Sequence, residues 1–113
     1  MAHTYAQTRV ASTPAIVVMG ALDTKGAEVA FVKEQIEQHG KPVLVIDTGV
    51  LGRASFAADV TRESVAEAGG TTIAALAAES DRGHAVTAMM EGTRTIVLQL
   101  HAEGRVAAVL GLG

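Results

Sequence analysis

The sequence VAAVLGLG at residues 106–113 predicts a buried strand that runs directly into glycines. In open α/β sheets, a strand that ends in glycine at the sheet edge is a common place for a phosphate-binding turn, with a helix after it. Here the turn begins and no helix follows it. We therefore expect this chain to be part of a longer nucleotide-binding protein, interrupted just inside a ligand loop.

Two earlier apolar runs, AIVVMG at 15–20 and PVLVID at 42–47, predict further strands buried on both faces. A helix is predicted between them, because apolar side chains recur on one helical face at Val29, Val32 and Ile36. Two buried strands joined by one helix form a βαβ unit, with a parallel pair and a right-handed crossover.

Polar residues and glycines mark where the helices should begin and end. The first helix is expected to be capped by Asp23 or Thr24 and to end at Gly40. Two short helices and one long helix should follow before the last strand. Their expected boundaries are 61–68 before Gly69 and Gly70, a segment capped by Thr71 or Thr72, and about 81–102 between Asp81 and Gly104.

These elements predict an α/β domain with an open, Rossmann-like parallel sheet of at least three strands in three layers. The domain should span residues 14–113, after a flexible N-terminal tail at residues 1–13. The long helix carries an apolar stripe at spacings of three and four. Its members are Val86, Met89, Met90, Thr93, Ile96, Val97 and Leu100.

The composition excludes several classes of protein. Apolar residues fill 49% of the 113 positions, which favours a folded domain over a disordered chain. A net charge of −3 argues against a nucleic-acid-binding surface, and the absence of cysteine excludes disulfides and thiolate chemistry. No run is long enough to span a membrane and no signal peptide is present, so we expect a cytoplasmic protein. The four histidines have no metal-ligand spacing.

Phe31 lies on the first helix, roughly opposite its apolar stripe. One interpretation is a single exposed aromatic residue, which needs no explanation. The other is a second contact surface, either for a segment absent from this chain or for another subunit in a homodimer.

The end of the first strand carries the first set of candidate binding residues. A glycine allows close backbone approach, helix N-terminal N–H groups can face an anion, and a hydroxyl and a cation can add contacts. The spacing matches neither a P-loop nor the GxGxxG dinucleotide motif, and an ordinary capped turn is the alternative. The candidates are Gly20, Ala21, Asp23, Thr24 and Lys25.

Further candidates lie at the other strand ends and at the start of the long helix. Asp47 is placed to accept hydrogen bonds from a ribose hydroxyl, and the alternative is an aspartate bonded to its own loop. Arg82 can reach a phosphate with its planar guanidinium, although a solvated arginine is commoner there. The remaining candidates are Thr48 and Gly49 beside Asp47, Gly83 beside Arg82, and the terminal glycines Gly111 and Gly113.

Four pieces, in order, resemble the ATP-binding domain family typified by the plant tobamovirus-resistance protein. The resemblance covers nearly the whole chain beyond Thr13 and includes a similar connecting stretch at 58–66. The four pieces are Gly20–Lys25 (GALDTK), Val45–Gly49 (VIDTG), Asp81–Gly83 (DRG) and Val109–Gly113 (VLGLG).

The resemblance implies the first of two Rossmann-like subdomains that enclose ATP, with or without Mg²⁺. The C-terminal subdomain, absent here, would then be a partner, and the strand at 106–113 would continue into a phosphate loop. No residue is marked as catalytic, and whether ATP is hydrolysed stays open. Two alternatives remain: an interaction or regulatory module with a structural nucleotide or none, and an enzyme acting on a phosphorylated or carboxylated metabolite.

Overall fold

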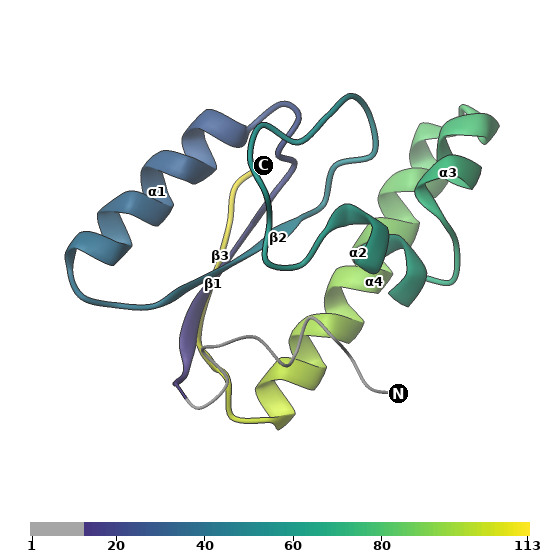
Figure 1. The fold of residues 1–113 in the computed structure, drawn as a ribbon. Helices are drawn as coiled ribbons and strands as arrows, with labels where there is room; N and C mark the ends of the chain where they lie inside the picture. The colour runs from purple at the N-terminus through teal and green to yellow at the C-terminus, as the bar shows by residue number, and fades with distance from the viewer. Residues whose placement is uncertain (1–12) are drawn as a thin grey trace.

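The computed structural model describes residues 13–113, in which strands and helices alternate along the chain (Figure 1). The elements are β1 (Ala15–Gly20), α1 (Gly26–Gln38), β2 (Val43–Asp47), α2 (Arg62–Ala68), α3 (Ile73–Glu79), α4 (Arg82–Ala102) and β3 (Val106–Gly111). This order confirms the predicted βαβ unit, the two short helices after it, and the final long helix and strand. The tail predicted at residues 1–13 lies outside the described residues, except for Thr13.

The three strands form one parallel sheet in the order β2-β1-β3. β1 is therefore the central strand, and β2 and β3 flank it. The carboxyl ends of all three strands point to the same edge of the sheet, which is uppermost in Figure 1. The predicted parallel α/β sheet is confirmed.

Helices cover both faces of the sheet and give the predicted three layers (Figure 1). Successive side chains of a strand point to opposite faces, so each strand contributes to two cores. Val17 belongs to the core shared with α2, α3 and α4, whereas Val18 belongs to the core shared with α1. The sheet is thus the middle layer between α1 and the group of three helices.

The expected burial of the last strand is wrong. All five residues of β2 are buried, whereas the segment Ala107–Leu110 of β3 is exposed. The reason is topological, because β3 is an edge strand and the described helices cover it only partly. Val109 and Leu110 keep 48% and 43% of their surface exposed, on opposite faces of the strand.

The outer edge of β2 is protected, unlike that of β3. Val60 forms a parallel bridge with Ile46, and its N–H donates to Val45 O at 2.9 Å. The Asp59 carboxylate accepts from Val45 N at 2.7 Å. A covered edge with a charged side chain resists pairing with another strand. The sheet is therefore closed on one side only, within the described residues.

The predicted helix ends are confirmed except at the start of α1. Thr61, Thr72 and Asp81 cap α2, α3 and α4 through their side-chain oxygens. At α1 the N-cap residue is Lys25, and no side chain caps the helix. Asp23 does not cap this helix, because its carboxylate accepts from Leu51 N at 3.1 Å. The loop after β2 thus binds the carboxylate that was expected to cap the helix.

The apolar stripe of α4 divides into two parts. Met89, Ile96 and Leu100 are buried in the core against the sheet. Val86 and Met90 are 51% and 65% exposed, and therefore face away from that core. In the part of the chain that the structure describes, neither α4 nor any other helix has the length and apolarity needed to cross a membrane.

Two glycines allow α2 and α4 to pack closely. A Cβ at Gly92 of α4 would lie 1.9 Å from the carbonyl oxygen of Val65. A Cβ at Gly69, just after α2, would lie 2.3 Å from the carbonyl oxygen of Ala88. Both distances are shorter than any side-chain contact allows, so the two backbones meet where only glycine fits.

His84, in the first turn of α4, contacts Glu79 at the end of α3. The hydrogen bond to Glu79, together with the charge of that carboxylate, raises the pKa of His84 above its ordinary value of 6.5. The folded state therefore gains from this pair below the unfolded pKa, and loses the gain as pH rises through the folded pKa. Because both side chains are exposed, the effect on stability should be small.

We expect Glu79→Gln to lower the pKa of His84 toward 6.5, because it removes the carboxylate that favours the imidazolium. An NMR titration of the imidazole resonances measures this pKa. Glu91→Gln, which changes an exposed carboxylate elsewhere on α4, is the matched control. An unchanged pKa in Glu79→Gln would show that the pair does not form in solution.

Candidate functional site

The strand ends that carry the predicted site residues meet at one edge of the sheet (Figure 1). The chain leaving β2 donates from Thr48 N to Gly20 O at 3.0 Å. The chain leaving β3 donates from Leu112 N to Met19 O at 2.9 Å. The carbonyl oxygens at the end of β1 thus bind the backbone that follows each of the two neighbouring strands. The structure confirms the proximity that a parallel sheet predicts for these segments.

A groove of about 630 Å³ opens at this edge, between the sheet and α4. Four predicted site residues line it, namely Gly20, Thr48, Gly111 and Gly113. Most other lining side chains are apolar and come from the strands and from α4. The charged lining residues are Glu91 and Arg94. Concave, mainly apolar sites with a few polar groups are typical of small-molecule pockets.

Two other predicted residues, Asp23 and Asp47, belong to a buried ion-pair cluster centred on Arg62. Arg62 Nε donates to Asp47 Oδ2 at 2.9 Å, and Arg62 Nη2 lies 3.5 Å from Asp23 Oδ2. Each of the three side chains keeps less than a tenth of its surface exposed. Charges taken out of water persist only when they are paired, so these groups depend on each other.

The same arginine anchors the loop that follows β2. Arg62 Nη1 donates to the carbonyl oxygens of Leu51 at 2.7 Å and Gly52 at 3.2 Å. Gly49 belongs here too, because a Cβ at this position would lie 2.7 Å from Arg62 Nη2. The loop after β2, the turn after β1 and the start of α2 are therefore joined through one guanidinium group.

The carboxylate of Asp47 bonds both to backbone N–H groups of nearby loops and to Arg62. Its Oδ1 accepts from Leu22 N at 3.1 Å and from Gly49 N at 2.9 Å, while Oδ2 accepts from Arg62. The alternative of an aspartate bonded to its own loop is what the structure shows. A ribose contact by Asp47 stays a prediction.

Arg62 was absent from the predicted site, although a signal for it exists. Aspartates predicted at the ends of two neighbouring buried strands require a counter-charge nearby. Between residues 48 and 68, the cationic residues are Arg53 and Arg62. Arg53 is exposed and Arg62 is buried, a difference that depends on how the loop folds.

The start of α1, the predicted anion site, is covered by the loop after β2. Ser55 N donates to Leu22 O at 3.1 Å, and a Cβ at Gly26 would lie 1.7 Å from Ser55 Oγ. Ala21 accepts at its carbonyl oxygen from Lys25 N at 2.7 Å, and Thr24 is exposed. Ala21, Thr24 and Lys25 lie outside the lining of the 630 Å³ groove. Their phosphate contacts stay predictions.

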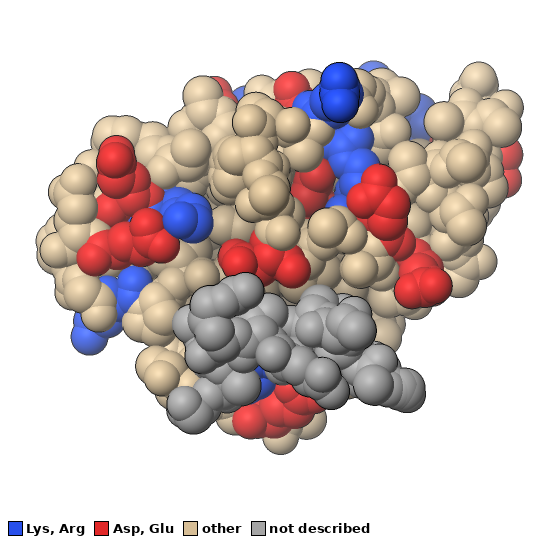
Figure 2. Space-filling model, in the orientation of Figure 1, with Lys and Arg blue, Asp and Glu red and all other residues tan. Residues whose placement is uncertain are grey.

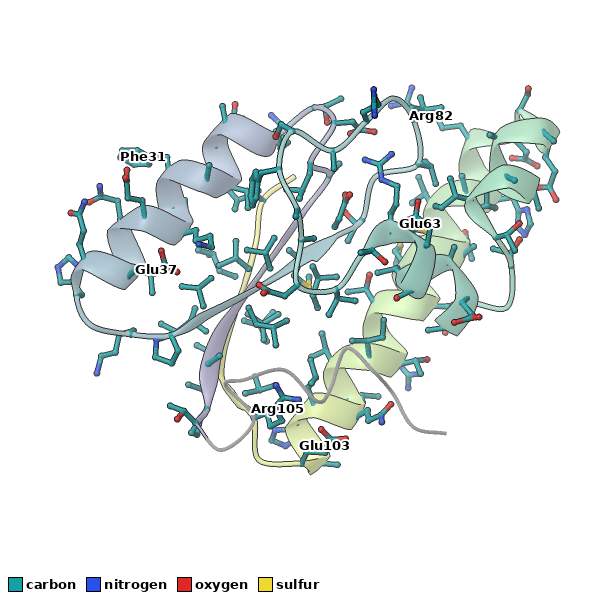
Figure 3. The ribbon with its side chains drawn as sticks, in the orientation of Figure 1. Phe31, Glu37, Glu63, Arg82, Glu103 and Arg105 are labelled. Atoms are coloured by element: carbon teal, nitrogen blue, oxygen red, sulfur yellow. The ribbon has the colours of Figure 1, made fainter. Side chains whose placement is uncertain are left out.

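Arg82 and Gly83 begin α4 at the same end of the molecule as the carboxyl ends of the strands (Figure 3). Both are exposed, and neither lines the groove. Acidic and basic side chains lie side by side at this end of the face shown in Figure 2. A contact from Arg82 to a bound phosphate would require the ligand to extend beyond the groove.

Comparison with known proteins assigns the chain to a family. Residues 14–113 match the model of the N-terminal domain of the Uncharacterised protein family UPF0261. The chain belongs to the UPF0261 family. It is 40% identical over 98 residues to a UPF0261 protein of Clostridium tetani, and 34% identical over 102 residues to one of Brucella suis. These alignments cover 87% and 90% of this chain.

The chain spans only 24% of the length of each of these UPF0261 proteins. Its match to an N-terminal domain agrees with the expectation that the domain is the first part of a longer protein. No solved structure matches the chain significantly. The family is thereby established, whereas binding of ATP stays a prediction.

Proposed function

We propose that this domain supplies one wall of an ATP site, and that a later part of the longer UPF0261 proteins supplies the opposite wall. The observation that carries the proposal is the gathering of Gly20, Thr48, Gly111 and Gly113 in one groove at the carboxyl edge. Open parallel sheets bind ligands at this edge. The resemblance to the ATP-binding domain family supports ATP, with or without Mg²⁺, as the ligand.

The glycines of the groove differ in what surrounds them. A Cβ at Gly20 would lie 2.9 Å from Val29 Cγ2, so packing against α1 already favours glycine there. A Cβ at Gly111 would meet Met19 Cε at 3.6 Å, and one at Gly113 would meet nothing within 4 Å. The backbone at Gly111 and Gly113 therefore leaves room for a phosphate group to approach, whereas the N–H of Leu112 between them already donates to Met19 O.

The charged residues near this edge have different roles in the proposal. Some are candidates for contacts to phosphate, and Asp47 positions a loop. Lys25 and Arg82 lie at the carboxyl end of the domain, outside the groove lining, and are the candidates for phosphate contacts of a ligand that extends beyond the groove. Arg94 lines the groove about three turns farther along α4. Asp47 acts through the loop, because its oxygens already accept from two backbone N–H groups and from Arg62. In the proposal it orients the segment that carries Thr48.

In the 113-residue chain, MgATP should shift the backbone amide resonances of Gly20, Gly111 and Gly113 in an ¹⁵N–¹H NMR titration. The affinity should be weak, in the millimolar range, because only one wall of the site is present. Gly40 and Gly104, which end α1 and α4, are internal controls. Separate titrations with inorganic triphosphate and with adenosine identify which part of ATP binds. Equal shifts at all five glycines, or none, would contradict the proposal.

In a full-length UPF0261 protein, such as that of Clostridium tetani, ATP should raise thermal stability. A ligand at ~100 times its dissociation constant adds about 2.7 kcal/mol to the free energy of unfolding. A calorimetric melt with millimolar ATP and magnesium measures this effect. An unchanged melting temperature would count against an ATP site in the family.

A second candidate function is an interaction or regulatory module, favoured by the apolar character of the groove and by Phe31, which is 62% exposed on the outer side of α1 (Figure 3). Turnover separates the possibilities. Tight ATP binding without formation of ADP favours the module. Release of ADP favours an enzyme, whose second substrate would be a phosphorylated or carboxylated metabolite.

A further inference from the structure

Four apolar side chains of the groove wall lie on one face of the domain. Val86 and Met90 of α4 and Val109 of β3 are exposed, and Val97 of α4 is half-buried. Val109 pairs with Val17, whose side chain lies in the α4-side core, so Val109 points to the same face of the sheet as α4. We name these four residues the helix seat.

The topology of the sheet indicates what covers the helix seat. The connection from β1 to β2 crosses the sheet in one direction and places α1 on one face. The connection from β2 to β3 crosses in the opposite direction and places α4 on the other face (Figure 1). This alternation is what right-handed crossovers require.

A connection from β3 to a further parallel strand beyond it would run in the same direction as the connection from β2 to β3. A right-handed crossover then places its helix on the α4 face, beside α4 and over Val109. The outer edge of β3 is uncovered within the described residues, whereas Asp59 and Val60 cover the outer edge of β2. Among the residues that the structure describes, the β3 edge is therefore the one at which the sheet can be extended.

The length of the family proteins supplies the segment. This domain matches the N-terminal domain of proteins of which the chain spans 24%, so a long stretch follows the domain in them. We propose that the helix seat receives an amphipathic helix from the segment that follows this domain in the longer UPF0261 proteins. The helix lies antiparallel to β3 and beside α4, with its apolar face on Met90 and Val109.

The proposal is independent of ATP, because it rests on exposure, on topology and on the length of the family proteins. It also has a consequence for the carboxyl edge. A helix that follows β3 begins beside Gly111 and Gly113, so its N-terminal N–H groups point toward that edge. The apolar length of the groove then holds protein, and the glycine-lined end stays open for a ligand.

Oxidation of methionine by peroxide tests the proposal, because adjacent residues of α4 provide an internal reference. Met90 is 65% exposed and Met89 is 4% exposed. The experiment compares this chain with the same chain extended by the segment that follows the domain in the Clostridium tetani protein. Oxidation of Met90, followed by peptide mass spectrometry, should slow about tenfold in the extended chain, toward the rate of Met89.

Equal oxidation of Met90 in the two chains would overturn the proposal. So would protection of Met90 that appears in the unextended chain and grows with its concentration, since a second copy would then be the occupant. Binding of MgATP that protects Met90 in the unextended chain would also overturn it. The first two outcomes do not depend on whether the carboxyl edge binds ATP.

A pair of substitutions provides a second readout. Met90→Asp should lower the melting temperature of the extended chain by several degrees and leave that of the 113-residue chain unchanged, because Met90 is exposed there. Leu98→Asp, at an exposed position of α4 outside the groove lining, is the control and should change neither chain. An equal response of both chains to Met90→Asp would count against the seated helix.

Discussion

Replacement of Arg62 by alanine should lower the free energy of unfolding of this domain by about 3–5 kcal/mol, the range found when one partner of a buried ion pair is removed. The substitution leaves two buried carboxylates, Asp23 and Asp47, without their cation. It also removes the donor to Leu51 O and Gly52 O. Since small domains are stable by roughly 5–15 kcal/mol, this is a large share of the total.

Urea denaturation followed by circular dichroism measures the loss. Arg53→Ala is the matched control, because Arg53 belongs to the same connection between β2 and α2 but is exposed, and should change stability by less than about 0.5 kcal/mol. Addition of Asp23→Asn to Arg62→Ala should recover part of the loss, since one unpaired charge disappears. If the two arginine variants are equally stable, the buried cluster does not hold the loop.

Gly92→Ala should cost about 3 kcal/mol, at the upper end of ordinary overpacking. A Cβ at this position would lie 1.9 Å from the carbonyl oxygen of Val65 and 2.9 Å from its carbonyl carbon, both of them backbone atoms of α2. A flexible side chain could turn away, whereas a helix backbone can only move as a whole. We expect α2 and α4 to separate and the core between them to loosen.

Gly83→Ala provides the control on the same helix. Its Cβ would have Asp81 Oδ1, at 3.6 Å, as its nearest neighbour, and alanine favours helix over glycine by up to about 1 kcal/mol. Gly83→Ala should therefore leave the melting temperature unchanged or raise it, while Gly92→Ala lowers it. A neutral Gly92→Ala would mean that α2 and α4 are farther apart in solution than the structure places them.

The strands and most helix ends could be predicted because local chemistry determines them. The apolar runs at 15–20 and 42–47 are short and continuous, which is typical of strands covered on both faces. Thr61 and Asp81 cap the helices predicted after them, since their side-chain oxygens satisfy N–H groups only three residues away. Such interactions need no distant partner, so they can be inferred from neighbouring residues.

The expectations that failed depend on residues far apart in the chain. Asp23 leaves the start of α1 uncapped because it accepts from Leu51, 28 positions away. The apolar run at 106–110 is a strand, as predicted, but its burial depends on which neighbours flank it. Apolar periodicity reports the strand and cannot report its place in the sheet.

The sequence alone determined the parallel α/β sheet, its three layers and the set of glycines at its strand ends, because hydrophobic spacing and turn chemistry act over a few residues. Only the tertiary structure decided which of those strand ends share a groove, which carboxylates Arg62 binds, and which face of β3 stays open. Pairing of buried charges and coverage of an edge strand are properties of distant segments brought together, and no local pattern encodes them.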